Sequence, residues 1–274
     1  MKKLSALIAA VSAVFLIAGC ANGSAGSSGG AKSSAGQSQV QNSEAGSSTA
    51  ASRNARTESS ASSNGSSVEQ GSLEQTQQEI RSALKTTAGL KLPQMVPVPK
   101  GYYISALAQH TSSGYTVTYK QTARPLKVND PSLSQARTLV TLKATVYSSD
   151  AEAGKQISFH RYGASDGQST DLGHRITGYT SAGAGTAGVS WNEGRWTLMA
   201  LSPTPDQVKA ISLAKSVVAY LDVYLLPVPH QYGMIQVYTD SRKSLAMWQD
   251  GRTVYQLTDA ADPMSLVQIA VSVK

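Results

Sequence analysis

The stretch Trp191-Asn192-Glu193-Gly194-Arg195 has a counterpart later in the chain, Trp248-Gln249-Asp250-Gly251-Arg252. In both, a tryptophan lies three residues before a glycine, and glycine tolerates the positive φ that a tight hairpin turn needs. Each stretch therefore predicts a β-hairpin built on an aromatic strand. A pattern that recurs indicates an internal repeat, so we take the two hairpins as the centres of two related units.

A helix is predicted after each hairpin, because a proline suited to the first helical position follows each one. Thr204 is expected to cap the first helix at Pro205, with Gln207 completing a capping box, and Asp262 is expected to cap the second at Pro263. Apolar residues recur at helical spacing in both helices, which predicts one buried face on each. These residues are Val208, Ile211, Ala214, Val218 and Leu221 in the first helix, and Leu266, Ile269, Ala270 and Val273 in the second.

A proline-rich run precedes the strands of each unit, at residues 96–102 and 226–232. The order of proline-rich run, strands, tryptophan hairpin and helix thus occurs twice. We predict an N-terminal helix plus a long first unit over residues 72–221, and a shorter second unit over residues 222–274 packed on the first. The predicted fold class is α+β, with a twisted, mainly antiparallel sheet and packed helices.

The remaining elements of the first unit follow from local patterns. Ser72 and Gln75 form a capping box, and Gly89 is placed as a helix stop, so a helix is expected over residues 73–88. Stretches rich in β-branched and aromatic residues predict strands. These stretches are residues 102–108, 115–121, 138–147 and 156–162, with a further strand after the Gly- and Ala-rich residues 179–188.

The N-terminus has the build of a secretory signal, with Lys2 and Lys3 before an uncharged apolar run over residues 4–17. The run is shorter than the roughly 20 residues that span a membrane. Its end, Leu16-Ile17-Ala18-Gly19-Cys20, resembles the lipobox of bacterial lipoprotein precursors. That resemblance implies a signal peptide over residues 1–19 and a diacylglycerol on Cys20 that anchors the chain at the outer face of the cytoplasmic membrane. The alternative is an ordinary secretory signal that contains a cysteine.

Between Cys20 and Gly71 the chain consists mainly of Ser, Gly, Ala, Gln and Asn, which predicts a disordered tether. Cys20 is the only cysteine, so no internal disulfide stabilises the chain. Residues 76–274 carry 19 basic and 13 acidic side chains. The basic residues are scattered, which favours a solvated surface over binding of a polyanion.

The body resembles extracytoplasmic domains of unknown function in Firmicute lipoproteins and in anti-sigma-factor-like membrane proteins. The resemblance lies in Pro99-Lys100-Gly101-Tyr102, in the tryptophan hairpin, and in Leu213-Ala214-Lys215-Ser216-Val217 of the helix that follows it. The second unit has Gln231 where the first has Gly101. A more distant similarity is to PsbP-like sandwiches, which are mostly non-enzymatic. The resemblance implies no defined chemistry, and it implies a role in the cell envelope.

One candidate for catalysis is Ser165, in the G-x-S-x-G pattern of residues 163–167. This pattern marks a nucleophile only where a strand precedes it and a helix follows, and the polar residues after it show no helical period. His174 and His230 are available as bases, but a plain surface turn is the favoured interpretation. The four histidines lie far apart in the sequence, so we predict no metal site and no cofactor.

The aromatic residues Trp191, Trp196, Trp248, Tyr102 and Tyr103 are the candidate binding residues. They could form a stacking platform for a wall glycan or a partner chain, although aromatic residues on a half-buried sheet more often belong to the core.

The sequence therefore predicts a lipid-anchored extracytoplasmic binding or interaction module without catalytic activity. Its expected partners are the membrane, through the lipid on Cys20, and an envelope protein or wall glycan, but not nucleic acid. The alternatives are an envelope sensor that acts through a membrane partner and a serine hydrolase that uses Ser165.

Overall fold

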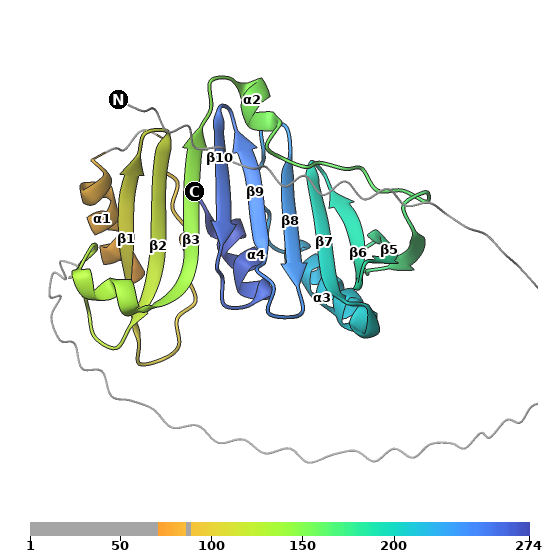
Figure 1. Ribbon diagram of the computed structural model, residues 1–274, viewed down its shortest axis with the longest axis horizontal. Helices are drawn as coiled ribbons and strands as arrows, with labels where there is room; N and C mark the ends of the chain where they lie inside the picture. The colour runs from red at the N-terminus through yellow and green to blue at the C-terminus, as the bar shows by residue number, and fades with distance from the viewer. Residues whose placement is uncertain (1–70, 86–88) are drawn as a thin grey trace, which may run out of the picture. The chain divides into compact units, whose positions relative to one another are not determined.

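Ten strands form one open sheet in the computed structural model, which describes residues 71–85 and 89–274 (Figure 1). The predicted signal peptide, the predicted lipidation site Cys20 and the predicted tether up to residue 70 lie outside the described residues. The described part has the predicted α+β fold. Its sheet is antiparallel except where β7 and β8 run parallel.

The elements follow one another along the chain as α1 (Leu73–Leu84), β1 (Tyr103–Thr111), β2 (Gly114–Thr122), β3 (Arg137–Val146), α2 (Asp150–Gly154), β4 (Gln168–Asp171), β5 (Thr177–Gly183), β6 (Thr186–Glu193), β7 (Trp196–Pro203), α3 (Gln207–Leu221), β8 (Gly233–Tyr238), β9 (Leu245–Asp250), β10 (Thr253–Thr258) and α4 (Pro263–Ser272). Short 3₁₀ helices span Pro131–Gln135 and Thr204–Asp206.

The second predicted unit is inserted into the sheet of the first. The strand order is β1-β2-β3-β10-β9-β8-β7-β6-β5-β4, so β8 to β10 lie between β3 and β7. The prediction that the second unit packs on the first is corrected accordingly. Because β3 and β7 would otherwise leave unpaired edges, the three inserted strands satisfy the backbone groups of both, with β10 paired to β3 and β8 to β7.

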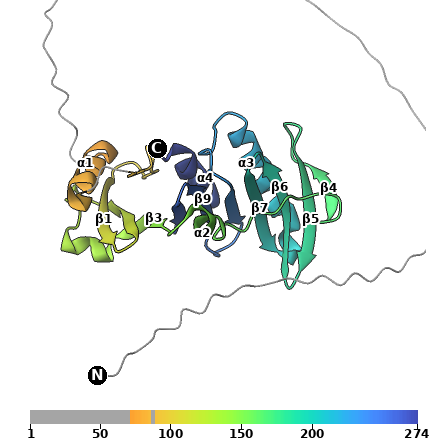
Figure 2. The same ribbon diagram turned by 90° about the horizontal axis from the view of Figure 1, so that it is seen from above.

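Helices α1, α3 and α4 cover one face of the sheet, and α2 lies on the other (Figure 2). The three helices share one hydrophobic core with the inward-facing residues of the strands. A much smaller apolar cluster lies under α2, around Ala153, Ile157, Met234 and Val254. Helix α3 is the crossover that a parallel pair such as β7 and β8 requires.

Both predicted tryptophan hairpins are present. Gly194 and Gly251 have φ of 57° and 55°, and each starts a two-residue loop between paired strands. The arginines that follow do not adopt positive φ, so both loops have the character of type II′ turns. Trp191 and Trp248 are each 1 % exposed, on strands that pack beneath α3 and α4 respectively.

The predicted helix faces need one correction. Leu266, Ile269, Ala270 and Val273 are buried as expected. In α3, Ala214, Val218 and Leu221 are buried as predicted, and Ile211 packs partly against the core. Val208, which was expected on the same face, is 75 % exposed, and Ala210 and Val217 are buried in addition.

The helix ends also differ in part from prediction. Asp262 caps α4 by accepting a hydrogen bond from the amide of Ser265 at 2.9 Å. Thr204 does not cap α3, because a 3₁₀ turn intervenes and the helix begins at Gln207. Helix α1 has the predicted capping box but ends at Leu84, four residues early, because Lys85 adopts a left-handed conformation.

Residues 156–162 do not form the predicted strand. This segment, which we call the strap, runs between α2 and β4 and is held by side chains of the sheet. The hydroxyl of Thr197 accepts from the amide of His160 at 3.0 Å and donates to its carbonyl at 2.8 Å. The side-chain amide of Asn192 donates to the carbonyl of His160 and accepts from the backbone amide of Tyr162. The backbone of the strap therefore finds its partners without a neighbouring strand.

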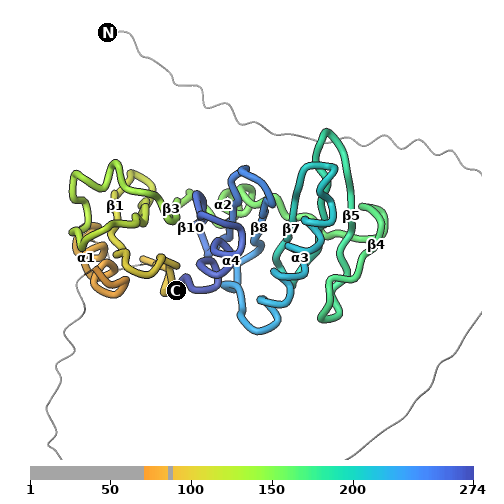
Figure 3. Tube along the Cα trace, turned by 90° about the horizontal axis from the view of Figure 1, so that it is seen from below, coloured from red at the N-terminus to blue at the C-terminus, as the bar shows by residue number. Residues whose placement is uncertain are grey.

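The segment just before the first proline-rich run is fixed by the C-terminal residues. The backbone of Leu92 exchanges two hydrogen bonds with that of Lys274, at 3.0 and 3.3 Å, and the amide of Gln94 donates to Ser272. Figure 3 shows the C-terminus beside this segment. The exit of α4 is thereby covered by residues from the start of the described chain.

Candidate functional site

A surface segment between α3 and β8 exposes most of the unburied apolar side chains. Val223, Leu225 and Val228 are 70–83 % exposed, Tyr224 is 49 % exposed and Tyr232 is 38 % exposed. These are five of the nine exposed large apolar residues in the described chain. We call residues 223–232 the apolar loop. Clustered exposed apolar residues mark interaction sites far more often than single ones do.

The sequence explains why this segment is neither helix nor strand. After α3 ends at Leu221, residues 222–224 form a turn. Pro227 and Pro229 lack backbone donors and restrict the residues before them, so the rest of the loop forms neither helix nor strand. The indole nitrogen of Trp196 donates to the carbonyl of Pro227 at 3.1 Å, and Arg195 donates to the carbonyl of His230 at 2.7 Å. The base of the loop is therefore fixed to the first tryptophan hairpin.

A cleft of about 380 Å³ lies between the apolar loop and this hairpin. Trp196, Leu226 and Pro227 contribute to its largely apolar walls, and Glu193 and Arg195 line it from the hairpin. The cleft extends to the end of α3, because Leu221 and Tyr224 line it as well. The cleft could accept an apolar group that reaches past the tips of the loop.

The acidic residue of the cleft carries a perturbed carboxyl group. Burial raises the pKa of Glu193, and the nearby charge of Asp222 raises it further. The indole nitrogen of Trp191 donates to this carboxyl at 2.9 Å, which opposes the shift. The carboxyl group of Glu193 is therefore harder to ionise in this cleft than it would be in water.

Aromatic pairs border the loop on both sides. Tyr220 and Tyr224 stack with ring centroids 4.6 Å apart, at the end of α3. Phe159 of the strap stacks on Tyr232 at 3.9 Å, and the guanidinium of Arg161 lies 5.9 Å from the centre of the Phe159 ring. The strap and the apolar loop therefore form one continuous surface.

The aromatic residues predicted as a binding platform are not brought together at the surface. Trp191, Trp196 and Trp248 are buried, and their rings pack in the core. Tyr102 is exposed and Tyr103 is half-buried, at the start of β1, on a different part of the sheet. Of these residues, only Trp196 lines the apolar cleft.

Sequence reasoning missed the apolar loop itself. Residues 226–232 were interpreted as the proline-rich run that leads into the second unit, and residues 223–225 received no interpretation of their own. A usable signal was present, because two prolines deny these large apolar residues a place in a regular buried strand. An apolar run that cannot join the core in regular form is a candidate for exposure.

Ser165 is not placed as a nucleophile. It lies in an exposed turn that follows the strap and precedes β4, where a nucleophile elbow requires a strand and then a helix. His174 pairs with Asp222 at 2.9 Å, and His230 lies 3.6 Å from Asp150. Within the described residues, no hydrogen bond joins either histidine to Ser165.

The described residues contain no group of three or more His, Cys, Asp or Glu that could hold a metal ion. None of the described helices is long and apolar enough to cross a membrane.

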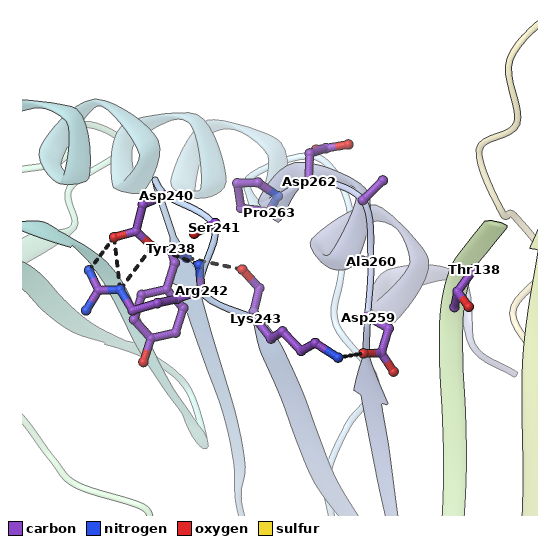
Figure 4. Close-up of a pocket in the computed structure, with 12 residues that line it drawn as sticks. Thr138, Tyr238, Asp240, Ser241, Arg242, Lys243, Asp259, Ala260, Asp262 and Pro263 are labelled. Carbon is purple, nitrogen blue, oxygen red and sulfur yellow. Dashed lines mark hydrogen bonds and ion pairs between the residues drawn. The ribbon is translucent and has the colours of Figure 1, made fainter.

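A second cleft of about 460 Å³ lies at the other end of β8 and β9 (Figure 4). Its charged side chains pair with one another, Arg242 with Asp240 at 2.8 Å and Lys243 with Asp259 at 2.5 Å. These pairs lower the pKa of both aspartates and raise the pKa of both bases. A charged ligand would have to break these pairs, so this cleft is the weaker candidate for a binding site.

In comparisons with known proteins, no family model, no curated protein and no solved structure matches the chain. The resemblances drawn from the sequence therefore stay predictions.

Proposed function

We propose that the chain is a lipid-anchored extracytoplasmic binding module that binds its partner through the apolar loop. The observation that supports this most is the concentration of exposed apolar residues between positions 223 and 232. Burying Leu225 and Val228 in an interface would remove apolar surface from water, at roughly 25 cal/mol for each Å². The anchoring half of the proposal depends on the lipobox at Cys20.

The rigidity of the loop supports a role in binding. A flexible apolar segment would lose conformational entropy on binding, and that loss would offset part of the gain. Here the hydrogen bonds to Pro227 and His230 and the two prolines restrict the loop in advance. The exposed side chains are therefore presented in a fixed arrangement.

Chemical labelling in the intact envelope tests the proposal without knowledge of the partner. Leu225→Cys and Val208→Cys place one thiol in the apolar loop and one at an equally exposed valine on α3. If the loop is occupied, a membrane-impermeant maleimide labels Leu225→Cys much more slowly in intact envelopes than in an unlipidated chain in buffer whose own Cys20 is replaced by serine. Val208→Cys should react at the same rate in both.

Equal labelling of Leu225→Cys in both samples would show that the loop is not a binding surface. The same experiment checks the anchor, because Cys20 is the only native cysteine and a thioether does not react with maleimide. Labelling of the native chain in the envelope would therefore contradict lipidation.

A further inference from the structure

The side chains around the apolar loop are graded by chemistry and by exposure. The aliphatic tips, Val223, Leu225 and Val228, are the most exposed. Tyr224 and Tyr232 are about half as exposed, and each stacks on another ring. Because the loop base is tied to Trp196 and Arg195, the tips are held outward and cannot collapse onto the sheet.

Two arginines lie at the base of this arrangement. Arg195 donates to the carbonyl of His230, and Arg161 lies over the ring of Phe159. In the part of the chain that the structure describes, neither guanidinium forms an ion pair with a carboxylate. Both keep donors free for phosphate oxygens, which guanidinium groups bind well.

The carboxylates near the loop contact groups other than these two arginines. Asp222 lies 2.9 Å from His174, and Asp150 lies 3.6 Å from His230. Glu193 accepts from the indole of Trp191. The guanidinium groups of Arg161 and Arg195 are therefore cations without a carboxylate partner among the described residues, and such groups complement an anionic partner.

The three kinds of side chain at this surface match the three chemical zones of a bilayer surface, which are hydrocarbon, the interfacial zone that tyrosine prefers, and phosphate. The backbone limits the depth of insertion. Among the described residues, the amides of Leu225 and Leu226 form no backbone hydrogen bond, so they must stay within reach of water or headgroups.

We infer that the partner of the apolar loop is the anionic surface of a lipid bilayer, with Val223, Leu225 and Val228 inserted at the interface and Arg161 and Arg195 on the phosphates. This inference rests on the proposed function, since it takes the loop to be the binding surface. The loop would hold the body against the membrane in an orientation that a lipid on Cys20 cannot set.

Vesicle flotation tests the inference. The protein is the chain from residue 20 onward with Cys20→Ser, which lacks both the apolar signal and the lipid. It should float with vesicles of phosphatidylcholine and phosphatidylglycerol, and much less with phosphatidylcholine alone. Leu225→Ser with Val228→Ser should lower the affinity by at least about tenfold, because the loop then has little apolar surface to insert.

Two single variants complete the test. Val208→Ser removes an equally exposed valine from α3 and should leave binding unchanged. Arg161→Gln should weaken binding to the anionic vesicles by about fivefold, as expected for one cation near a charged surface, and should not change binding to neutral vesicles. Thermal melts of all variants should match that of the parent chain, because the replaced side chains lie at the surface.

Failure to float, equal binding to both vesicle types, or equal binding by the double variant would each overturn the inference. If Leu225→Cys is nevertheless protected in the envelope, the proposed function stands and the partner is a protein or glycan. If Leu225→Cys is unprotected there, the proposed function fails, whatever the vesicles show.

Discussion

Replacing each hairpin tryptophan with phenylalanine tests whether Trp191 and Trp248 are equivalent core positions that differ in one polar contact. Both are 1 % exposed, and both lie three residues before the glycine of a type II′ turn. The indole nitrogen of Trp191 donates to Glu193 at 2.9 Å. The indole nitrogen of Trp248 is buried with no hydrogen-bond partner in the protein.

The repeat itself explains this difference. Asp250 occupies the position that corresponds to Glu193, but its side chain is one methylene shorter, and it pairs with Lys91 at 2.8 Å. Trp248 instead packs its ring against Tyr255 and Trp196, at centroid distances of 5.4 and 6.1 Å. The two sites therefore share the loss of volume on replacement and differ in the polar term.

The magnitude follows from that difference. Truncation of either tryptophan to alanine is expected to cost roughly 3–5 kcal/mol. Because a domain is stable by only about 5–15 kcal/mol, such variants could unfold, and their stabilities could then not be compared. Replacement by phenylalanine leaves a similar cavity at both sites, so the cost of the cavity nearly cancels when the two variants are compared. Trp191→Phe loses a hydrogen bond to a carboxyl group, worth about 1.5–3 kcal/mol, whereas Trp248→Phe removes an unpaired buried donor.

We therefore expect Trp191→Phe to be less stable than Trp248→Phe by about 2 kcal/mol or more, which is roughly 4–8 °C in Tm for a body of this size. Urea and thermal unfolding at neutral pH measure the difference directly. The difference in stability between the two variants should become smaller at acidic pH, where Glu193 is neutral and accepts a weaker hydrogen bond. Equal losses, or a larger loss for Trp248→Phe, would refute the reasoning.

Three further predictions concern single contacts. Gly233→Ala should destabilise the chain by about 1–3 kcal/mol, because its Cβ would lie 2.5 Å from the Trp196 ring, whereas Gly183→Ala meets no atom within 4 Å and should be neutral in the same urea titration. The stability that Glu193 contributes is fully present below its usual pKa and declines as pH rises through its raised folded-state pKa. The Tm of Glu193→Gln should therefore exceed the Tm of the native chain by a margin that grows from acidic to neutral pH. A margin that shrinks over this range would contradict the raised pKa. Thr197→Val removes the hydroxyl that holds the strap, so the strap amides should lose hydrogen-exchange protection while the core amides keep theirs. Retained protection of the strap amides would show that other contacts hold the strap.

Local features of the fold could be predicted because their causes are local. The two turns depend on a glycine at a fixed distance from the tryptophan, and the cap of α4 depends on Asp262 alone. The insertion of β8 to β10 between β3 and β7 could not be predicted, since it depends on which distant strand edges meet. The strap was misassigned for a related reason. Its composition favours a strand, but the groups that bind its backbone are side chains far along the chain.

The candidate site shows the same limit. The two proline-rich runs have matching patterns, with Val98 and Val228 at corresponding positions. Val98 packs partly against the core, whereas Val228 is 79 % exposed. Sequence likeness between the repeats therefore predicts the backbone of these runs but not their burial. Likewise, the aromatic composition suggested a platform, and only the packing shows that the indoles face inward.

The exposure of the apolar loop is not a requirement of the repeat. Helices α3 and α4 occupy corresponding places after the two hairpins. The residues at the end of α4 are paired, because Lys274 and Ser272 form backbone hydrogen bonds with Leu92 and Gln94, just before the first proline-rich run. The exit of α3 leads into the second run, which forms no such cover over itself. The apolar surface at the exit of α3 is therefore not required by the fold that the repeat shares, and the proposed binding role gives it a purpose that stability does not.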